Sequence, residues 1–570
     1  MPDISKLIAA AKGAIDVDLL IRNCRIVNLF SGNIQKNNIA VHQGRIVGFG
    51  DYPAKKTINA RERYLAPGFI DGHVHIESSM LSPAYFAEAV VRHGTTAVIA
   101  DPHEIVNVLG LEGLQTFLDR TVSLPVDFYF MMPSCVPATH LETAAYKITA
   151  EAMKSFWSED RIPGLGEMMN YPGVIHQDPA TLDKIKLYQK KIIDGHAPLL
   201  KDKALSAYMA AGITSDHECS TIEEAREKLE KGMFILIREG SAAKNLAALL
   251  PLVNDYNAGN FGFCTDDRHP DYLMEKGHID DIVREAITYG IAPVRALQLS
   301  SLNIARHYQL RQRGAIGIGY IADLVLFDDL NDINVVQVFK NGELVINDGV
   351  LVTPLHHAGH EFQNSLHIKQ LPDKSFAVPA TDKPVKIIQT VPDQILTRKT
   401  TALLPRDNHE LQVDLKHDIL KLAVVERHKK TGNVQTAFVN GFGLKQGAIC
   451  STVAHDSHNL IILGTNDRDM EKCVEVVQEL KGGLAVVVDE KTIASLPLPF
   501  GGLMSDNNLT DVYHDYLGVV AAAREYGCVM ADPFMSLSFL ALPVIPELKL
   551  TDKGLVDVGK FDFTSLYETD

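Results

Sequence analysis

Between residues 66 and 267 the sequence alternates short apolar runs with helix-forming segments, and this alternation limits the fold more than any other feature. The run APGFIDGHVH precedes SPAYFAEAVVRHG, in which Ser82 is a typical helix N-cap and Pro83 a typical first helical residue. Eight apolar runs begin near residues 68, 96, 127, 163, 192, 213, 233 and 261. Strands that alternate with helices pair in parallel. We therefore predict an α/β fold with a (β/α)8 TIM barrel over residues 66–313.

A doubly wound open sheet is the structural alternative to the barrel. Such sheets commonly carry a Gly-x-Gly-x-x-Gly motif after the first strand. The sequence has no such motif after its first apolar run, which disfavours the open sheet.

Shorter strand-like segments with Gly, Asn and Asp turns flank the predicted barrel at residues 1–65 and 314–380. Because both segments show this pattern of short strands and turns, we predict that they form one β-sandwich-like domain. A polar connector is predicted near residues 356–385. A chain of 570 residues is too long for one hydrophobic core. Residues 381–570 are accordingly predicted to form a further domain of mixed α/β type.

The composition limits the possible binding partners of the protein and the cellular compartment in which we expect it. The formal net charge is −16, which argues against a nucleic-acid-binding surface. The 7 cysteines include no Cys-x-x-Cys pair, so we expect no disulfide framework and a reducing compartment. The N-terminal segment lacks the pattern of a signal peptide, and we find no apolar run long enough to span a membrane. We therefore expect a cytoplasmic protein that contacts neither nucleic acid nor membrane.

Ionisable side chains stand at the ends of the predicted strands, where the active sites of β/α barrels lie. The first strand ends in His73 and His75, which are two positions apart and so point to the same side. The residues that follow the later strands are Asp101, His103, Glu104, Glu167, His196, His217, Arg238, Glu239, Ser241 and Asp266. One histidine after a strand is usually an ordinary loop residue. Four histidines and two acids at one barrel mouth instead predict a site for Zn, Mn or Fe.

Several motifs resemble a known family. PGFIDGHVHIE, followed by His196, His217 and Asp266, resembles the amidohydrolase superfamily, and GAIGIGYIADLVLFD, with Asp323, resembles the exit of that superfamily's barrel into its β-domain. Within the superfamily, the segments GHVHIESSML, ADPHEI, GLGEMMN, DGHAP, SDHE, LIREGSAAKNL, VAHDSHNLIILG and LPLPFGGLMSD resemble the adenine deaminase family. The resemblance covers nearly the whole chain. It implies hydrolysis of adenine to hypoxanthine and ammonia in purine salvage, by a homodimer or larger homo-oligomer.

The resemblance also implies a centre of two divalent metal ions, Mn²⁺ or Fe²⁺, although the ligand types alone leave Zn²⁺ open. The ligands that it implies are His73, His75, Glu167, His196, His217 and Asp266. Many relatives bridge two ions with a carboxylated lysine on the fourth strand. This chain has Glu167 at that position, which implies a carboxylate bridge.

Two ions that share a water make it a hydroxide source near neutral pH, and we expect attack on C6 of adenine. Asp266 is expected to accept the proton of the water and pass it to the leaving amine. Glu77 or Glu239 would protonate a ring nitrogen, and Glu77 is favoured because it adjoins the ligands. Asp101, His103 and Glu104 are candidates to move protons or orient the ligands, and a simple loop turn is the alternative for Asp101-Pro102-His103.

The other candidate substrate contacts lie on loops. They are Ser78, Ser79, Arg238, Glu239 and Ser241 in the barrel, with His455, Asp456 and His458 in the last domain. A serine after a strand is also a common helix cap. The stretch HDSHN at residues 455–459 is either a hairpin turn or a cover over the barrel mouth.

Two other functions remain as alternatives. The first is an amidohydrolase that opens a cyclic amide, such as a dihydropyrimidinase or dihydroorotase, and the missing fourth-strand lysine disfavours it. The second is a non-catalytic scaffold, which the complete set of ligand residues disfavours. The chain has neither Pro-Cys-x-x-Cys nor His-Glu-x-x-His, so zinc nucleobase deaminases of the other type and metalloproteases with that motif are excluded.

Overall fold

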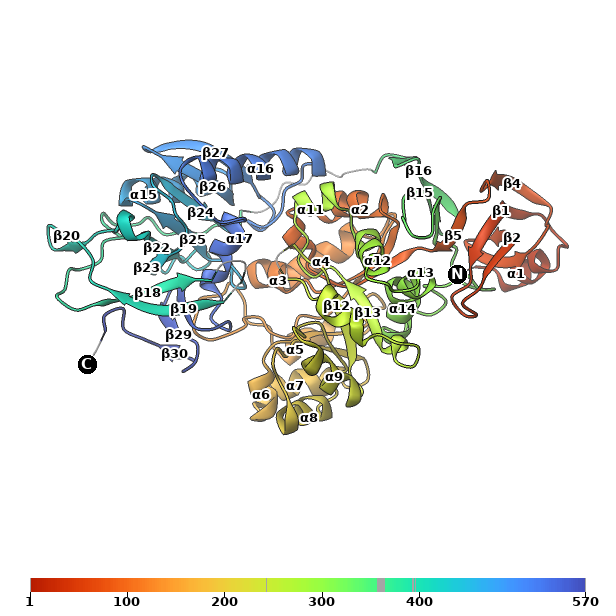
Figure 1. Ribbon diagram of the computed structural model, residues 1–570, viewed down its shortest axis with the longest axis horizontal. Coiled ribbons are helices and arrows are strands. Elements are labelled where there is room, and N and C mark those ends of the chain that lie inside the picture. Colours follow the sequence, from red (N-terminus) through yellow and green to blue (C-terminus); the bar gives the residue numbers. More distant parts are fainter. Residues whose placement is uncertain (1, 242, 356–363, 392–393, 395, 569–570) are drawn as a thin grey trace.

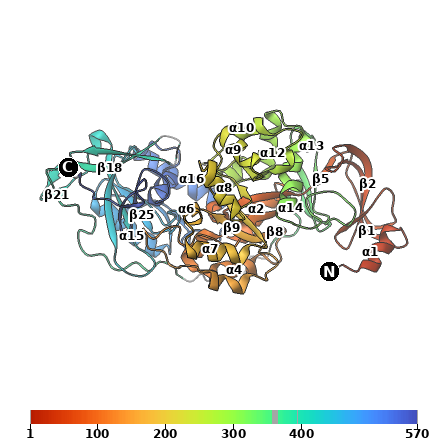
Figure 2. The same ribbon diagram turned by 90° about the horizontal axis from the view of Figure 1, so that it is seen from below.

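The computed structural model describes residues 2–241, 243–355, 364–391, 394 and 396–568. Three parts lie along its long axis: an N-terminal sheet at one end, a barrel in the middle and a C-terminal unit at the other end (Figures 1 and 2). Residues 356–363 of the expected connector lie outside the described residues. Within the described ranges, no helix has the length and apolar character needed to cross a membrane.

The middle part is a TIM-barrel-type domain in which strands and helices alternate. Its strands are β6 (Phe69–Val74), β7 (Thr95–Ala100), β8 (Asp127–Phe130), β9 (Gly164–Met168), β10 (Ile192–Gly195), β11 (Ser215–Asp216), β12 (Phe234–Arg238) and β13 (Phe261–Cys264). Its helices are α2 (Pro83–Val91), α3 (His103–Leu109), α4 (Leu111–Arg120), α5 (Ala150–Met153), α6 (Tyr171–Ile175), α7 (Pro179–Tyr188), α8 (Asp202–Ala210), α9 (Ile222–Glu230), α10 (Leu246–Leu249), α11 (Pro270–Glu275), α12 (Ile279–Thr288), α13 (Pro293–Leu297) and α14 (Asn303–His307). The strands begin within two residues of the positions predicted from the apolar runs.

The barrel strands close into a ring in chain order. Parallel ladders join β6-β7-β8, β9-β10 and β11-β12-β13, and β10 lies beside β11. The parallel bridge between Met132 and Leu165 links β8 to β9, and the bridge between Val74 and Asp266 links β6 to the end of β13. Because all strands run in the same direction, their carboxyl ends meet at one mouth.

The two segments that flank the barrel share one sheet. Its elements are α1 (Ile4–Ala11), β1 (Val17–Val27), β2 (Ile34–His42), β3 (Arg45–Phe49), β4 (Ala54–Asn59), β5 (Tyr64–Pro67), β14 (Leu324–Phe327), β15 (Val335–Lys340), β16 (Glu343–Asn347) and β17 (Val350–Leu351). Strand β14 runs antiparallel to β5, with Leu324 opposite Pro67. The chain therefore leaves the barrel through a strand that pairs with the strand by which it entered, and all these strands belong to one continuous sheet.

The C-terminal unit is built on a second large sheet in the order β19-β18-β23-β22-β25-β24-β26-β27. Its main elements are β18 (Val385–Thr390), β19 (Thr397–Ala402), β22 (Ile419–Val425), β23 (Val434–Asn440), β24 (Ala448–Ser451), β25 (Leu460–Gly464), α15 (Asp467–Glu479), β26 (Gly483–Val488), β27 (Lys491–Pro497), α16 (Leu509–Glu525) and α17 (Pro533–Ser538). Smaller pieces are β20 (Arg406–Asp407), β21 (Glu410–Leu411), β28 (Leu548–Thr551), β29 (Gly554–Asp557) and β30 (Asp562–Phe563). Apolar residues of the C-terminal unit, including Leu422, Leu463 and Leu548, belong to the same core cluster as residues of the barrel.

The serine predicted to cap α2 has a different role. Ser82 occupies the N-cap position, but its side chain makes no capping hydrogen bond. Its hydroxyl instead donates to Oδ1 of Asp506 at 2.8 Å, and Leu81 forms a bridge with Ser505. A tertiary contact thus overrides the local signal and ties the C-terminal unit to the barrel mouth.

A buried charge network joins the N-terminal sheet to the barrel. The Lys340 ammonium on β15 donates to Oδ2 of Asp323, at 2.8 Å, and to Asp127 at the start of β8. Arg313 pairs with the same two carboxylates. Asp323, found in the segment ADLVLFD, also accepts the backbone N–H of Asn341. The shared carboxylates hold the exit strand against the barrel.

Replacing Lys340 with Met should lower the free energy of unfolding by about 3 kcal/mol, because two carboxylates lose a buried partner. Urea unfolding of both proteins would measure the change. The control is Lys56→Met on the exposed surface of β4, which should shift stability by less than about 0.5 kcal/mol. Equal stability of the two variants would contradict a structural role for the network.

Candidate active site

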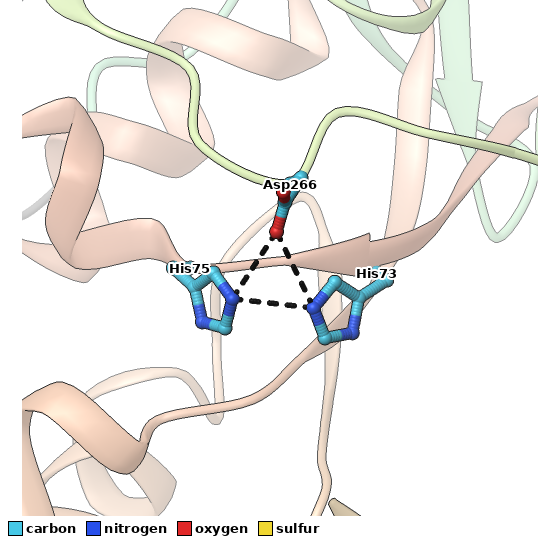
Figure 3. A group of neighbouring side chains, drawn as sticks. All are labelled: His73, His75 and Asp266. Atoms are coloured by element: carbon cyan, nitrogen blue, oxygen red, sulfur yellow. Dashed lines mark hydrogen bonds and ion pairs between the residues drawn. The ribbon is translucent and has the colours of Figure 1, made fainter. Parts of the chain in front are cut away.

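Closure of the barrel places three predicted ligands side by side. The Asp266 N–H donates to the His73 carbonyl at 2.9 Å, and the His75 N–H donates to the Asp266 carbonyl at 3.0 Å. The Nε2 atoms of His73 and His75 lie 3.2 Å apart, and Oδ1 of Asp266 lies 3.5 and 3.3 Å from them (Figure 3). Two strand ends that are distant in sequence thus present nitrogen and oxygen donors to one point.

A hydrogen bond determines which nitrogen of His75 is available. Its Nδ1 lies 2.9 Å from the carbonyl oxygen of Asp101. A carbonyl can only accept, so Nδ1 carries the proton and the neutral ring has its lone pair on Nε2. That lone pair points toward the carboxylates of Asp266 and Glu167, where a cation would satisfy it.

Glu167 lies between this group and a second one formed by His196, His217 and Glu218. Its Oε1 is 3.4 Å from Nε2 of His75, on the first side. Its Oε2 is 2.7 Å from Nδ1 of His196 and 3.3 Å from Nε2 of His217, on the second side. The two oxygens of one carboxylate therefore face two different sets of imidazole donors.

The backbone around Glu167 leaves little freedom. Its N–H donates to Oδ2 of Asp101 at 2.8 Å. A Cβ atom on the preceding Gly166 would lie 2.1 Å from that same oxygen, so only glycine fits there. His103 adds a further contact, with Nδ1 3.5 Å from Oε1 of Glu167 and 3.6 Å from Oδ1 of Asp101. Asp101 and His103 thus touch the ligand group, which a bare loop turn would not require.

The pKa shifts indicate anionic carboxylates beside groups that take positive charge. Burial alone would raise the pKa of Glu167, but His196 and His217 outweigh it and hold that pKa well below its usual range. Burial would lower the pKa of His75, but Asp266 and Glu167 hold it well above the usual value. A metal ion competes with protons for such donors.

The donor set fits divalent metal ions. Groups of donor atoms within 4.8 Å of one another include His73 with His75 and Asp266, His73 with Glu167 and His217, and His196 with His217 and Glu218. Neutral imidazole and carboxylate together suit Mn, Fe and Zn. Several lone pairs and negative charges converge in a buried space, an arrangement that is costly without a cation.

Arg238 and Glu218 lie beside the donor atoms and pair with each other. The guanidinium takes both oxygens of Glu218, at 2.5 and 2.9 Å, and donates to Oδ2 of Asp266 at 2.6 Å. Such a bidentate pair fixes both partners. Arg238, predicted as a substrate contact, is therefore engaged with carboxylates. Sequence analysis missed Glu218 as a site residue, although its place directly after His217 was a signal.

The remaining barrel candidates have partners outside the group of donor atoms. The Ser79 hydroxyl donates to the Ile76 carbonyl, within its own turn. The Ser241 hydroxyl accepts from the backbone of His269, and Glu239 pairs with Lys244 at 3.2 Å. Of the predicted serines, Ser78 comes nearer, because its hydroxyl donates to Asp267, the residue after Asp266.

The C-terminal unit reaches the barrel mouth through the turn between β24 and β25. His455 Nδ1 lies 2.7 Å from Oε1 of Glu104, beside His103. Burial would lower the pKa of His455, but Glu104 raises it to about 9. Burial, together with the charge of Glu104, raises the pKa of the neighbouring Glu77 to about 8. Burial also raises the pKa of Asp456, against the pull of His103. The turn therefore covers the mouth rather than ending in solvent.

Comparisons with known proteins agree with this architecture. The model of the amidohydrolase family matches residues 64–345, and the model of the adenine deaminase C-terminal domain matches residues 394–562. An adenine deaminase of Desulfatibacillum aliphaticivorans is 48% identical over 99% of each chain. Adenine deaminases of Syntrophobacter fumaroxidans and Methanothrix thermoacetophila are 48% and 46% identical, again over 99% of each chain.

Replacing Glu167 with Gln should lower the metal content to about half or less of the wild-type value, since the group facing both imidazole sets loses its charge. Elemental analysis of protein purified from Mn-supplemented culture measures this. Glu223→Gln, on the exposed face of α9, is the matched control and should keep the wild-type content. Full occupancy in the Glu167 variant would argue against a shared ligand.

Proposed function

The chain belongs to the adenine deaminase family of the amidohydrolases, and we propose that it hydrolyses adenine to hypoxanthine and ammonia. We further propose that this reaction serves purine salvage. Relatives that carry the name adenine deaminase align over nearly the full length, so both the barrel and the C-terminal unit belong to the comparison.

The observation that carries the proposal is the position of Glu167. One carboxylate oxygen faces His75 and the other faces His196 and His217. With His73 and Asp266, these residues would hold two divalent ions. Such a pair of ions, when bound, would lower the pKa of a water so that it supplies hydroxide, the attacking nucleophile, near neutral pH. We propose Mn²⁺ or Fe²⁺, with Zn²⁺ also compatible with these donors.

Asp266 is the residue that we assign to proton transfer from water to the leaving amine. Its Oδ1 faces His73 and His75, and its Oδ2 accepts a hydrogen bond from Arg238. The arginine holds the carboxylate in one orientation, which a general base requires. Burial would raise the pKa of Asp266, but Arg238 and the imidazoles hold it well below the usual range, so the group is anionic.

Glu77 is the residue that we assign to protonation of a purine ring nitrogen. Its Oε1 accepts from the Ile105 N–H at 3.1 Å. Its Oε2 is buried and has no hydrogen-bond partner among the described residues. Buried carboxylate oxygens are nearly always paired, so this atom is suited to a ligand. Asp101 and His103 orient Glu167 in this proposal rather than contact the base.

The base would lie between the metal-binding residues and the C-terminal turn. Ser78, in the short helix Ile76–Ser79 that follows β6, and Asp456, in the C-terminal turn, are both buried, and we propose that they border this space. Asp456 retains one oxygen without a partner among the described residues. A planar heterocycle with several ring nitrogens suits a buried site with a few fixed polar groups.

Mn-loaded protein should release ammonia from adenine, with an ultraviolet spectrum that changes to that of hypoxanthine. Adenosine, dihydrouracil and dihydroorotate, offered under the same conditions, should give no comparable reaction. The measurement follows ammonia and absorbance together. Fully metal-loaded protein that leaves adenine unchanged would refute the proposed function, and turnover of dihydrouracil or dihydroorotate would favour the cyclic-amide alternative.

Glu77→Gln should lower kcat for adenine by about 100-fold or more, because the ring loses its proton donor. Metal content should stay at the wild-type value. Glu239→Gln is the matched comparison, because Glu239 was the other candidate for this role and pairs with Lys244. A larger loss of kcat in the Glu239 variant would transfer the assignment to that residue.

A further inference from the structure

A second polar cluster lies where the C-terminal unit meets the barrel. It consists of Glu104 at the start of α3, with His455 and His458 from the turn between β24 and β25. One donor atom from each lies within 4.8 Å of the others, and all three residues are buried. Polar groups at this depth require partners.

The hydrogen bonds of His458 show what the cluster can bind. Its Nδ1 accepts the backbone N–H of Ala454 at 3.2 Å, so the proton of the neutral ring lies on Nε2. Burial holds the pKa of His458 well below its usual value, and His455 and Arg427 add to this effect against the pull of Glu104. Nε2 is therefore a donor without a lone pair, which makes the cluster a poor metal site.

Two complementary atoms in the cluster have no partner. Nε2 of His458, a donor, is buried and lacks a hydrogen bond to any described residue, and so is Oε2 of Glu104, an acceptor. The other oxygen of Glu104 is held by His455 at 2.7 Å. The cluster therefore holds one unpaired donor and one unpaired acceptor among the described residues, each with a fixed role.

The turn that carries His458 cannot rearrange to satisfy these atoms. Nε of Arg427 donates to the His458 carbonyl, and Nε2 of His428 donates to the Ser457 carbonyl at 2.6 Å. The Asn459 side chain donates to the Thr143 carbonyl at 2.8 Å. The ring of His455 also stacks on Phe539, with centroids 4.8 Å apart. The unpaired donor and acceptor are thus held ready for a ligand.

We propose that His458 and Glu104 determine specificity by reading the N3–N9 edge of free adenine. The His458 N–H donates to N3, and the Glu104 carboxylate accepts the N9–H. This inference rests on the proposed function, because the edge that carries the amine must face the metal-binding residues where C6 reacts. In a nucleoside N9 carries the sugar, so there is no N9–H. The buried Glu104 carboxylate would then lack the donor with which it pairs in free adenine. Sites built around such a hydrogen bond reject analogues that lack it.

A chemical double-mutant cycle tests the pairing. Wild type and His458→Phe are each assayed with adenine and with 3-deazaadenine, in which C–H replaces N3. For wild type, kcat/KM should be about 10-fold lower with 3-deazaadenine than with adenine, after correction for the different intrinsic reactivity of the two compounds. His458→Phe should lose a similar factor on adenine and no further factor from N3 replacement, because the same hydrogen bond is already missing.

The controls separate recognition from folding. His428→Phe disturbs the same turn but not the proposed contact, so it should keep the wild-type ratio between adenine and 3-deazaadenine. His458→Gln, which retains an N–H donor, should recover part of the lost activity. Metal content should equal that of wild type in all variants.

The outcomes distinguish this inference from the proposed function. Failure of wild type to deaminate adenine would refute the function itself. A His458→Phe variant that still discriminates N3 to the wild-type extent would overturn the inference while the function stands. If that variant does not fold, wild-type inhibition by 3-deazaadenine and 9-methyladenine decides. Each should bind about 10-fold more weakly than adenine, and equal binding would overturn the proposal.

Discussion

The hydrogen bonds that close the barrel between β6 and β13 are the constraint on which the site depends. The Asp266 N–H donates to His73, and the His75 N–H donates to Asp266. These two bonds determine the register of the first strand against the last, and with it the meeting of three donor atoms at one point. A shift of one residue would turn both histidines away from the aspartate. The remaining ligands follow because the intervening strands end at the same mouth.

Glu167 extends this arrangement from one cluster to two. Its backbone is held by the Asp101 carboxylate, and the glycine before it allows that close approach. Its two oxygens face separate imidazole groups. The pair of Arg238 with Glu218 and Asp266 then neutralises part of the negative charge that this concentration of carboxylates creates. The candidate metal centre is therefore organised by buried charged side chains, which orient one another through hydrogen bonds and ion pairs.

The C-terminal unit contributes chemistry as well as cover. Its turn places His455 against Glu104, and Arg427 and His428 hold the backbone of that turn from behind. The contact between Ser82 and Asp506 fastens the same unit at another point of the mouth. Glu104 and Glu77 are both buried in the whole chain, and Glu104 contacts the C-terminal unit directly through His455. Separation of the reacting centre from water thus depends on two parts of the chain that are far apart in sequence.

The sequence by itself predicted the barrel and the candidate metal ligands at its mouth. Apolar runs alternate with helix signals at a period that only parallel pairing satisfies, and His73, His75, Glu167, His196, His217 and Asp266 stand directly after those runs. Local pattern is sufficient to predict their position because parallel strands all end at the same mouth of the barrel, so residues that follow the strands gather there. Only the tertiary structure decided the partner of each group. It drew Ser82 from its helix cap to Asp506, engaged Arg238 with Glu218, and brought His458 to Glu104. These pairings join surfaces whose relative placement follows from packing between distant segments, and no local spacing encodes that placement.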